Sequence, residues 1–323
     1  MTVGMSENTG LAEEPGPAED AQEGEAEGVT EDLAEGVPPT ALLVAAARAI
    51  ETHRPDALAR DPYAEHFVRA APAAARWPLH PQDVPDGEAD PLWGRLGRYF
   101  ALRTRALDDQ LLRAVQLGAR QVVLLGAGLD TRAYRLDWPA DCALYEVDRP
   151  GVLAFKQRVL DGIDARPTAQ RSTVAADFRT DWTETLTAAG FHPDQPTAWL
   201  AEGLLLHLPS TTERELFATV DRFSAPGSTL AYEALLQEAE PGADPAAGRD
   251  HPVHTATRER TGIDLLALLD AGPRPDTPAD LAARGWSTTA HTPFEFTRHY
   301  GRGPLPERDD ALAATRWVFA ARP

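Results

Sequence analysis

Two glycines and three carboxylates in this sequence stand where side chains could bind a ligand. Gly126 and Gly128 follow an apolar run, and glycines placed after a buried strand let a ligand approach the backbone closely. Asp148, Asp177 and Glu202 each lie at the end of a later apolar run. A glycine turn followed by three such acidic groups predicts a polar ligand site along one edge of a sheet.

The position of the first carboxylate narrows the ligand to two cofactors. Asp148 follows Gly126 by about 20 residues, the spacing at which an acidic side chain can accept both ribose hydroxyls of a bound nucleoside. NAD and S-adenosylmethionine both present these hydroxyls, so the carboxylate alone does not choose between them.

The glycine turn favours S-adenosylmethionine. A dinucleotide site has the pattern G-x-G-x-x-G, which places the pyrophosphate at a helix N-terminus. Here Thr131 replaces the third glycine, and Asp130 before it would repel a phosphate and occupy the backbone donors. S-adenosylmethionine carries no phosphate and has a net positive charge, so acidic surroundings suit it.

The elements that position these residues alternate between strand and helix from Gln121 onward. This alternation predicts a doubly wound α/β fold, in which ligands bind at the carboxyl ends of parallel strands. The expected strands are 121–127, 142–148, 172–178, one within 196–209, and 228–236, followed by helices at 258–270 and 280–286 and strands at 287–296 and 316–323.

The segment before the sheet differs in character. Residues 39–118 contain helical patterns, including 40–53 and 92–117, and we expect them to form a helical cap on a core of residues 119–323. Residues 1–38 hold eleven acidic side chains, no lysine and no arginine, and few large apolar groups. They cannot bury a core, so we expect a disordered acidic tail.

Composition excludes several classes of protein. Residues 1–38 account for eleven of the nineteen net negative charges, and the mildly acidic remainder argues against nucleic acid as the main partner, because phosphate binding needs a basic surface. No apolar run reaches the roughly 18–20 residues that cross a bilayer, and no signal peptide is apparent. The single Cys142 excludes an intramolecular disulfide. We therefore expect a cytoplasmic protein, and its oligomeric state is not predicted.

Five motifs stand in order along the chain: ALRTRALDD (101–109), LGAGLDTRAYRL (125–136), EVDRP (146–150), AADF (175–178) with Trp182, and PTAWLAEGLLLHLP (196–209). In this order they resemble the leucine carboxyl methyltransferase family, especially its actinobacterial branch of S-adenosylmethionine-dependent methyltransferases. The resemblance covers roughly residues 40–323 and implies a Rossmann-like methyltransferase core.

The resemblance also implies roles for single residues. Arg103 would hold the methionine carboxylate of the cofactor, and Gly126, with Gly128, would admit its methionine part. Asp148 would hold the ribose hydroxyls. The adenine would be read by Asp177 and by the backbone of Phe178, while Glu202 would lie near the methionine amino group and the reaction centre.

Three histidines are further candidates. Members of the family usually have Tyr where this chain has His207, so His207 is a candidate catalytic residue beside Glu202, the alternative being a packed or surface histidine. The insertion 237–257, with His251 and His254, would form a lid or acceptor wall, or else a solvent loop. No carboxylate or thiol partner for these two histidines is evident, so no metal site is predicted.

The expected reaction is direct in-line methyl transfer to an oxygen of a small molecule, with secondary metabolites as one acceptor class. A carboxylate acceptor is already ionised at neutral pH, whereas a hydroxyl would need a general base such as His207. Two alternatives stay open: an NAD(P)-dependent oxidoreductase on the same core, and a non-catalytic homologue that keeps the cofactor site.

Overall fold

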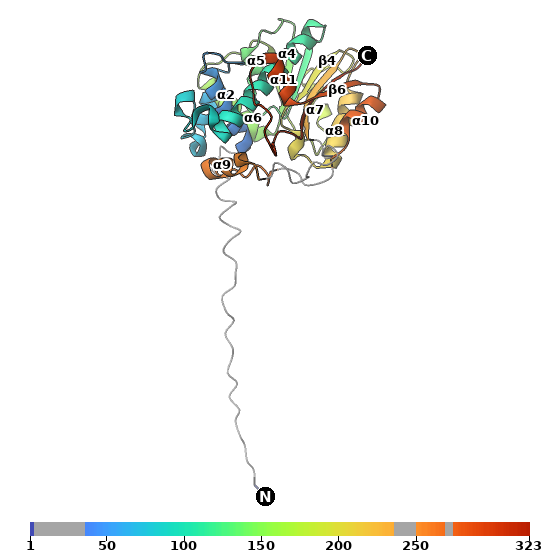
Figure 1. Ribbon diagram of the computed structural model, residues 1–323. Coiled ribbons are helices and arrows are strands. Elements are labelled where there is room, and N and C mark those ends of the chain that lie inside the picture. Colours follow the sequence, from blue (N-terminus) through green and yellow to red (C-terminus); the bar gives the residue numbers. More distant parts are fainter. Residues whose placement is uncertain (3–35, 236–249, 269–273) are drawn as a thin grey trace.

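A seven-stranded sheet forms the centre of the molecule (Figure 1). The computed structural model describes residues 1–2, 36–235, 250–268 and 274–323. Across the sheet the strand order is β3-β2-β1-β4-β5-β7-β6. The strands are β1 (Gln121–Leu125), β2 (Ala143–Asp148), β3 (Gln170–Ala175), β4 (Thr197–Ala201), β5 (Thr229–Leu235), β6 (Ser287–His291) and β7 (Thr315–Ala321).

The first five strands are parallel, and the chain order reverses at β1, which pairs with both β2 and β4. This confirms the predicted doubly wound α/β fold. The sheet is nevertheless mixed, because β7 runs antiparallel to its two neighbours β5 and β6. The strand pattern in the sequence did not predict that β7 would lie between β5 and β6.

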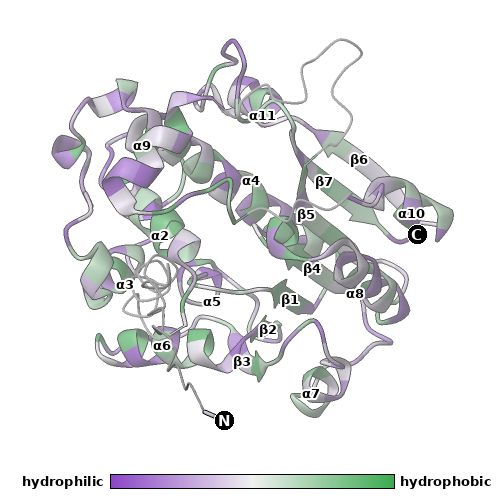
Figure 2. Cartoon of the chain, turned by 90° about the horizontal axis from the view of Figure 1, so that it is seen from below, coloured by the Kyte–Doolittle hydropathy of each residue, from purple (hydrophilic) through white to green (hydrophobic). Residues whose placement is uncertain are grey.

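Helices cover both faces of this sheet (Figure 2). Seen from below, α7, α8 and α10 lie on one side of the row of strands, and α4, α5, α6 and α11 lie on the other. The helices are α2 (Pro39–Thr52), α3 (Ala64–Ala70), α4 (Gly97–Gln116), α5 (Arg132–Arg135), α6 (Pro150–Asp161), α7 (Thr183–Ala188), α8 (Ser210–Arg222), α9 (Pro252–Thr261), α10 (Thr277–Ala283) and α11 (Pro293–Tyr300), with short turns η1 (Pro72–Ala74), η2 (Pro81–Asp83), η3 (Gly87–Ala89), η4 (Pro91–Leu96) and η5 (Leu205–His207).

Successive side chains of β1 point to opposite faces of the sheet and pack into two separate apolar cores. Val122 and Leu124 pack into the core that includes the N-terminal helices, whereas Val123 and Leu125 pack into the core on the opposite face. All of β1 is buried, as expected for a central strand covered on both faces. A strand held this firmly fixes the position of the glycine turn that follows it.

The segment before the sheet is helical within the residues described. Helix α2 packs on α3 and α4, and α4 contacts β4 and β5 directly. Val37, assigned from the sequence to the acidic tail, is buried against this core. The greater part of the predicted tail, 3–35, and residues 237–249 of the insertion lie outside the described residues.

Three element boundaries differ from the predictions. The expected strand 287–296 ends at His291, because Thr292 and Glu295 form a capping box that starts α11. The expected helix 258–270 begins earlier, at Pro252, where the His251 side chain caps it. The third strand ends at Ala175, so Asp177 follows it in a loop. No helix in the described ranges combines the length and apolarity needed to span a membrane.

Candidate active site

The sheet brings the predicted site residues to one edge. Asp148 ends β2, Glu202 directly follows β4, and Asp177 follows β3 by two residues. Because β3, β2, β1 and β4 are parallel neighbours, their carboxyl ends lie side by side, with the turn at Gly126 between Asp148 and Glu202.

The glycine turn is fastened to β2 by backbone hydrogen bonds. The N–H groups of Gly126 and Ala127 both donate to the Val147 carbonyl oxygen, at 2.9 and 3.1 Å. Gly126 and Gly128 have φ of 64° and 47°, values that favour glycine. A Cβ atom on Gly126 would lie 2.9 Å from Leu204 Cδ1, so a side chain at this position would require the Leu204 side chain to shift.

Asp148 is oriented by the same turn. Its Oδ2 accepts the backbone N–H of Gly128 at 2.6 Å, and its Oδ1 accepts that of Arg149 at 2.7 Å. Burial raises the pKa of Asp148, and the two backbone hydrogen bonds offset only part of that effect. Both oxygens keep a further lone pair, so the carboxylate can still accept two hydroxyl groups.

A pocket of about 550 Å³ opens beside Asp148. Asp177 lies in its wall, and a bidentate contact with Arg179 lowers the pKa of that carboxyl to about 2. Phe178 is half-buried and packs edge-on against Trp182, with ring centroids 5.6 Å apart. The pocket is lined by Gly36, Arg149, Pro150, Gly151, Val152, Ala175, Ala176, Asp177, Thr180, Asp181 and Thr185.

Glu202 is held by three arginines from separate parts of the chain. Its Oε1 accepts from Arg48 Nη2 at 2.7 Å and from Arg103 Nε at 3.0 Å, and its Oε2 accepts from Arg132 Nη1 at 2.7 Å. Burial alone would raise the pKa of Glu202, but the three guanidinium groups outweigh it and hold that pKa well below its usual range. Glu202 is therefore an ionised, fully paired carboxylate.

Arg103 lies between two carboxylates. Besides Glu202, it contacts Glu233 of β5, whose Oε2 accepts from Arg103 Nη1 at 2.5 Å. The guanidinium also lies over the ring of Phe100, 4.9 Å from its centroid. Burial would lower the pKa of Arg103, but Glu233 and Glu202 raise it further above its usual value. Within the described parts of the chain, its Nη2 donates no hydrogen bond.

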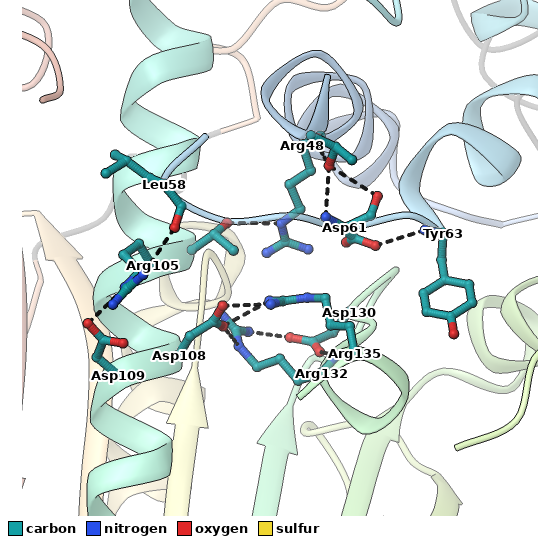
Figure 3. Close-up of polar contacts among 12 residues, drawn as sticks. Arg48, Leu58, Asp61, Tyr63, Arg105, Asp108, Asp109, Asp130, Arg132 and Arg135 are labelled. Carbon is teal, nitrogen blue, oxygen red and sulfur yellow. Dashed lines mark hydrogen bonds and ion pairs between the residues drawn. The ribbon is translucent and has the colours of Figure 1, made fainter. Parts of the chain in front are cut away.

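Buried ion pairs anchor the short helix α5 to α4 (Figure 3). Arg132 donates to Asp108 Oδ1 at 2.7 Å and also contacts Asp130. Arg135 grips Asp108 with two hydrogen bonds of 2.6 and 2.8 Å. Asp130 additionally accepts the backbone N–H of Arg132 at 2.7 Å, so it does occupy a donor at the helix start, as expected from the sequence.

Three of the charged groups around Arg103 and Glu202 were not predicted as site residues. Arg48 and Arg132 complete the coordination of Glu202, yet neither belonged to the predicted set. Arg48 is the only charged residue within the apolar helical run 42–50, and that isolation is a signal that could have identified it. Glu233 stands out similarly, as the only charged residue of the strand run 228–236.

His207 lies apart from these contacts. It is exposed on η5, and its Nδ1 lies 2.9 Å from the carbonyl oxygen of Leu268. Among the contacts of the described residues, none joins His207 to the cluster around Glu202. The structure thus brings Arg103, Asp148 and Glu202 to one sheet edge, while His207 is placed on the following turn.

Histidines lie beside carboxylates at two other places in the described residues. His251 has a carboxylate neighbour that the sequence did not reveal, since its Nε2 lies 3.1 Å from Glu307 Oε2. His53, Glu65 and His80 place ligand atoms within 4.8 Å of one another, looser than the roughly 3.3 Å between neighbouring ligands of a tetrahedral zinc ion. Glu65 is also paired with an arginine, at 3.2 Å.

A glycine turn after the central strand, with carboxylates at the neighbouring strand ends, is typical of a Rossmann-like core that binds a nucleoside cofactor. The model of the leucine carboxyl methyltransferase family matches residues 41–221, more than half of the chain. The chain belongs to this family. It is an enzyme that uses S-adenosyl-L-methionine, as the resemblance of its motifs implied.

Relatives extend the match over nearly the whole chain. A Streptomyces coelicolor protein named as a candidate S-adenosyl-L-methionine-dependent methyltransferase is 60% identical, covering 91% of this chain and 95% of its own length. A Saccharopolyspora erythraea protein of the same description is 43% identical, covering 90% and 97%. A solved Streptomyces avermitilis structure, of a duf574 family protein, covers 80% of this chain and 97% of its own at 16% identity and a TM-score of 0.47, a likeness too low to bear on function.

Proposed function

We propose that the enzyme transfers a methyl group to an oxygen of a small molecule, with a carboxylate as the preferred acceptor. The observation that carries this proposal is the state of Glu202. Three arginines hold it ionised, and the direct contacts of both its oxygens are with guanidinium groups, so it is a poor proton acceptor. A site without a free base at this position suits an acceptor that needs no deprotonation.

The residues present fit the cofactor. Arg103 has one guanidinium nitrogen left for the methionine carboxylate, and Glu202, which contacts Arg103, would lie near the methionine ammonium group. The bare turn at Gly126 admits the methionine part, Asp148 can accept both ribose hydroxyls, and the pocket beside Asp177 can take the adenine. Bound S-adenosylmethionine supplies an electrophilic methyl group on its sulfonium.

The contribution of this chain is then positioning and electrostatic matching. A carboxylate acceptor must reach the methyl carbon in line with the departing sulfur. Rigid side chains around the cofactor raise the fraction of bound complexes that have this geometry. The buried pairs of Arg132 with Asp108 and Glu202 supply this rigidity, because they join α4, α5 and the end of β4.

A hydroxyl acceptor is the second candidate, and His207 is the observation that favours it. If Nδ1 carries the proton donated to the Leu268 carbonyl, Nε2 keeps its lone pair and can accept a proton. An exposed His207 on the turn after Glu202 would then serve as the general base.

The chemistry of the product separates these candidates. The enzyme is incubated with S-adenosylmethionine carrying a tritiated methyl group and a panel of small carboxylic acids matched with the corresponding alcohols. A methyl ester releases volatile tritiated methanol in mild alkali, whereas a methyl ether does not. Label released from the acids supports the proposal, and alkali-stable label from the alcohols would overturn it in favour of the hydroxyl acceptor.

Calorimetry tests the two broader alternatives. We expect S-adenosylmethionine and S-adenosylhomocysteine to bind and NAD not to bind, because Asp130 occupies the helix-start donor that a pyrophosphate would use. Binding of NAD alone would contradict the proposed function. Cofactor binding without turnover on any member of the panel would favour the non-catalytic homologue.

A further inference from the structure

Glu233 belongs to none of the motifs that identified the cofactor site, yet it contacts the arginine at its centre. We infer that Glu233 is a positioning residue, which acts through Arg103 on how the enzyme holds the carboxylate at the methionine end of its cofactor. The inference rests on the proposed function, because it requires Arg103 to contact that carboxylate.

Both oxygens of Glu233 are used inside the protein. Oε2 accepts from Arg103 Nη1 at 2.5 Å, and Oε1 accepts from the hydroxyl of Tyr99. The indole N–H of Trp317 donates to that Tyr99 hydroxyl oxygen at 3.3 Å. All four side chains are buried. A line of hydrogen bonds therefore runs from β7 through α4 to β5 and ends on Arg103.

This line fixes the plane of the guanidinium. A guanidinium group is flat, and two hydrogen bonds to different nitrogens stop it from turning. Glu202 binds Nε and Glu233 binds Nη1, which leaves Nη2 as the nitrogen without a hydrogen bond among the described residues. Losing Glu233 would leave one direct contact, and Nη2 would no longer be held in one direction.

Tyr99 keeps Glu233 in place. Burial, and then the neighbouring Glu233 carboxylate, raise the pKa of Tyr99 well above its usual value, so its hydroxyl keeps its proton and donates it. Both oxygens of the buried Glu233 already accept hydrogen bonds from protein groups, so we expect any effect on the cofactor to pass through Arg103.

The test compares two ligands that differ at the methionine end. S-adenosylhomocysteine carries the amino acid carboxylate, and 5′-methylthioadenosine lacks it while keeping the adenosine and the thioether. We expect Glu233→Gln to weaken S-adenosylhomocysteine binding about tenfold and to leave 5′-methylthioadenosine binding unchanged. The exposed Glu215→Gln serves as the control and should change neither affinity.

Combining variants shows whether the effect passes through Arg103. In an Arg103→Ala background, Glu233→Gln should cause no further loss of S-adenosylhomocysteine affinity. Tyr99→Phe removes a single hydroxyl and should weaken S-adenosylhomocysteine in the same direction but less. If Glu233→Gln fails to fold, Tyr99→Phe replaces it in the comparison of the two ligands.

Three results would overturn the inference: unchanged S-adenosylhomocysteine affinity, equal losses for both ligands, or the same loss in the Arg103→Ala background. If the unmodified enzyme bound S-adenosylhomocysteine no more tightly than 5′-methylthioadenosine, the role of Arg103, and with it this part of the proposed function, would fail first.

Discussion

Gly128 donates its backbone N–H to Asp148 Oδ2 at 2.6 Å, so the turn after β1 orients the carboxylate that ends β2. A ligand resting on the glycine turn is therefore presented to an acceptor whose direction is already set. Pre-orientation of this kind lowers the entropy lost on binding.

Asp148→Ala should weaken S-adenosylmethionine binding by about 2–4 kcal/mol, because two charge-assisted hydrogen bonds to the ribose would be lost. Calorimetry at neutral pH measures the change. The exposed Asp137→Ala is a matched control and should bind normally. Equal affinity for Asp148→Ala and the unmodified enzyme would show that the ribose is held elsewhere.

The cofactor affinity should also fall on acidification. Because burial raises the pKa of Asp148, its carboxylate begins to take up a proton at a higher pH than an ordinary aspartate does. The protonated form loses acceptor capacity, so binding weakens as the pH falls toward that pKa. Affinity titrations of Asp148→Asn should lack this component, and an identical pH profile in the variant would assign the effect to another group.

Gly126→Ala should lower both stability and cofactor affinity. Its φ of 64° costs a side chain about 1–2 kcal/mol, and the new Cβ would meet Leu204. Gly262 is the matched control, since its φ is 73° and a Cβ there meets nothing within 4 Å. Thermal unfolding should show a loss for both variants. Calorimetry should show a loss for Gly126→Ala alone, and normal affinity in that variant would mean that the turn lies outside the cofactor site.

Glu202→Gln should destabilise the protein at neutral pH by about 3–5 kcal/mol, since it breaks a buried ion network. The pKa of Glu202 is lower in the folded than in the unfolded state. Its contribution is therefore complete above the unfolded pKa of about 4.3 and declines as the pH falls below it.

Denaturant unfolding at several pH values measures this difference. The gap in unfolding free energy between the unmodified enzyme and Glu202→Gln should narrow as the pH is lowered from 5 toward 3. An exposed carboxylate of α7, changed in Glu184→Gln, should show no such gap. A gap that stays constant with pH would mean that the charge of Glu202 contributes little.

Two truncations test where the predicted acidic tail ends. Deleting residues 1–35 should leave stability and cofactor binding intact, which is the behaviour expected of an acidic tail. Deleting residues 1–38 also removes the buried Val37, whose burial is worth about 1.5–3 kcal/mol. It further removes Gly36, which lines the pocket beside Asp177. Equal stability of the two truncated proteins would contradict this boundary.

The local patterns predicted the parallel half of the sheet well, because strands buried on both faces have a strong apolar signal. The antiparallel insertion of β7 was not predictable, since strand order is decided by contacts between residues far apart in the sequence, as between Trp317 and Glu233. Ser210, with Glu213 three residues on, has the pattern of a capping box, and the sequence therefore predicts a side-chain cap at Ser210. That prediction is wrong for a similar reason. Glu213, three residues on, contacts Thr277 and Arg274 instead, and α8 has no side-chain cap.

Short motifs predicted the residues that the structure brings to the sheet edge, whereas the residues that distant elements contribute there were missed. Gly126 is recognisable because it begins a glycine turn after an apolar run, and Asp148 is recognisable because it ends the next apolar run. Arg48 becomes part of the site only when α2 packs against α4. The residues next to Arg48 in the sequence do not indicate that Glu202 is its partner. The local signal of such a residue is that it is the single charged residue within an apolar run of the sequence, as Arg48 is within residues 42–50.

The place of β7 has a consequence for the order in which the protein matures. This strand comes last of the seven in the sequence, yet it lies inside the sheet between β5 and β6 and carries the indole that contacts Tyr99. The sheet cannot be completed until residues 315–321 have been synthesised. The arginine at the centre of the site therefore gains its full set of supports only after β7 is made, and a chain cut before β7 would lack them.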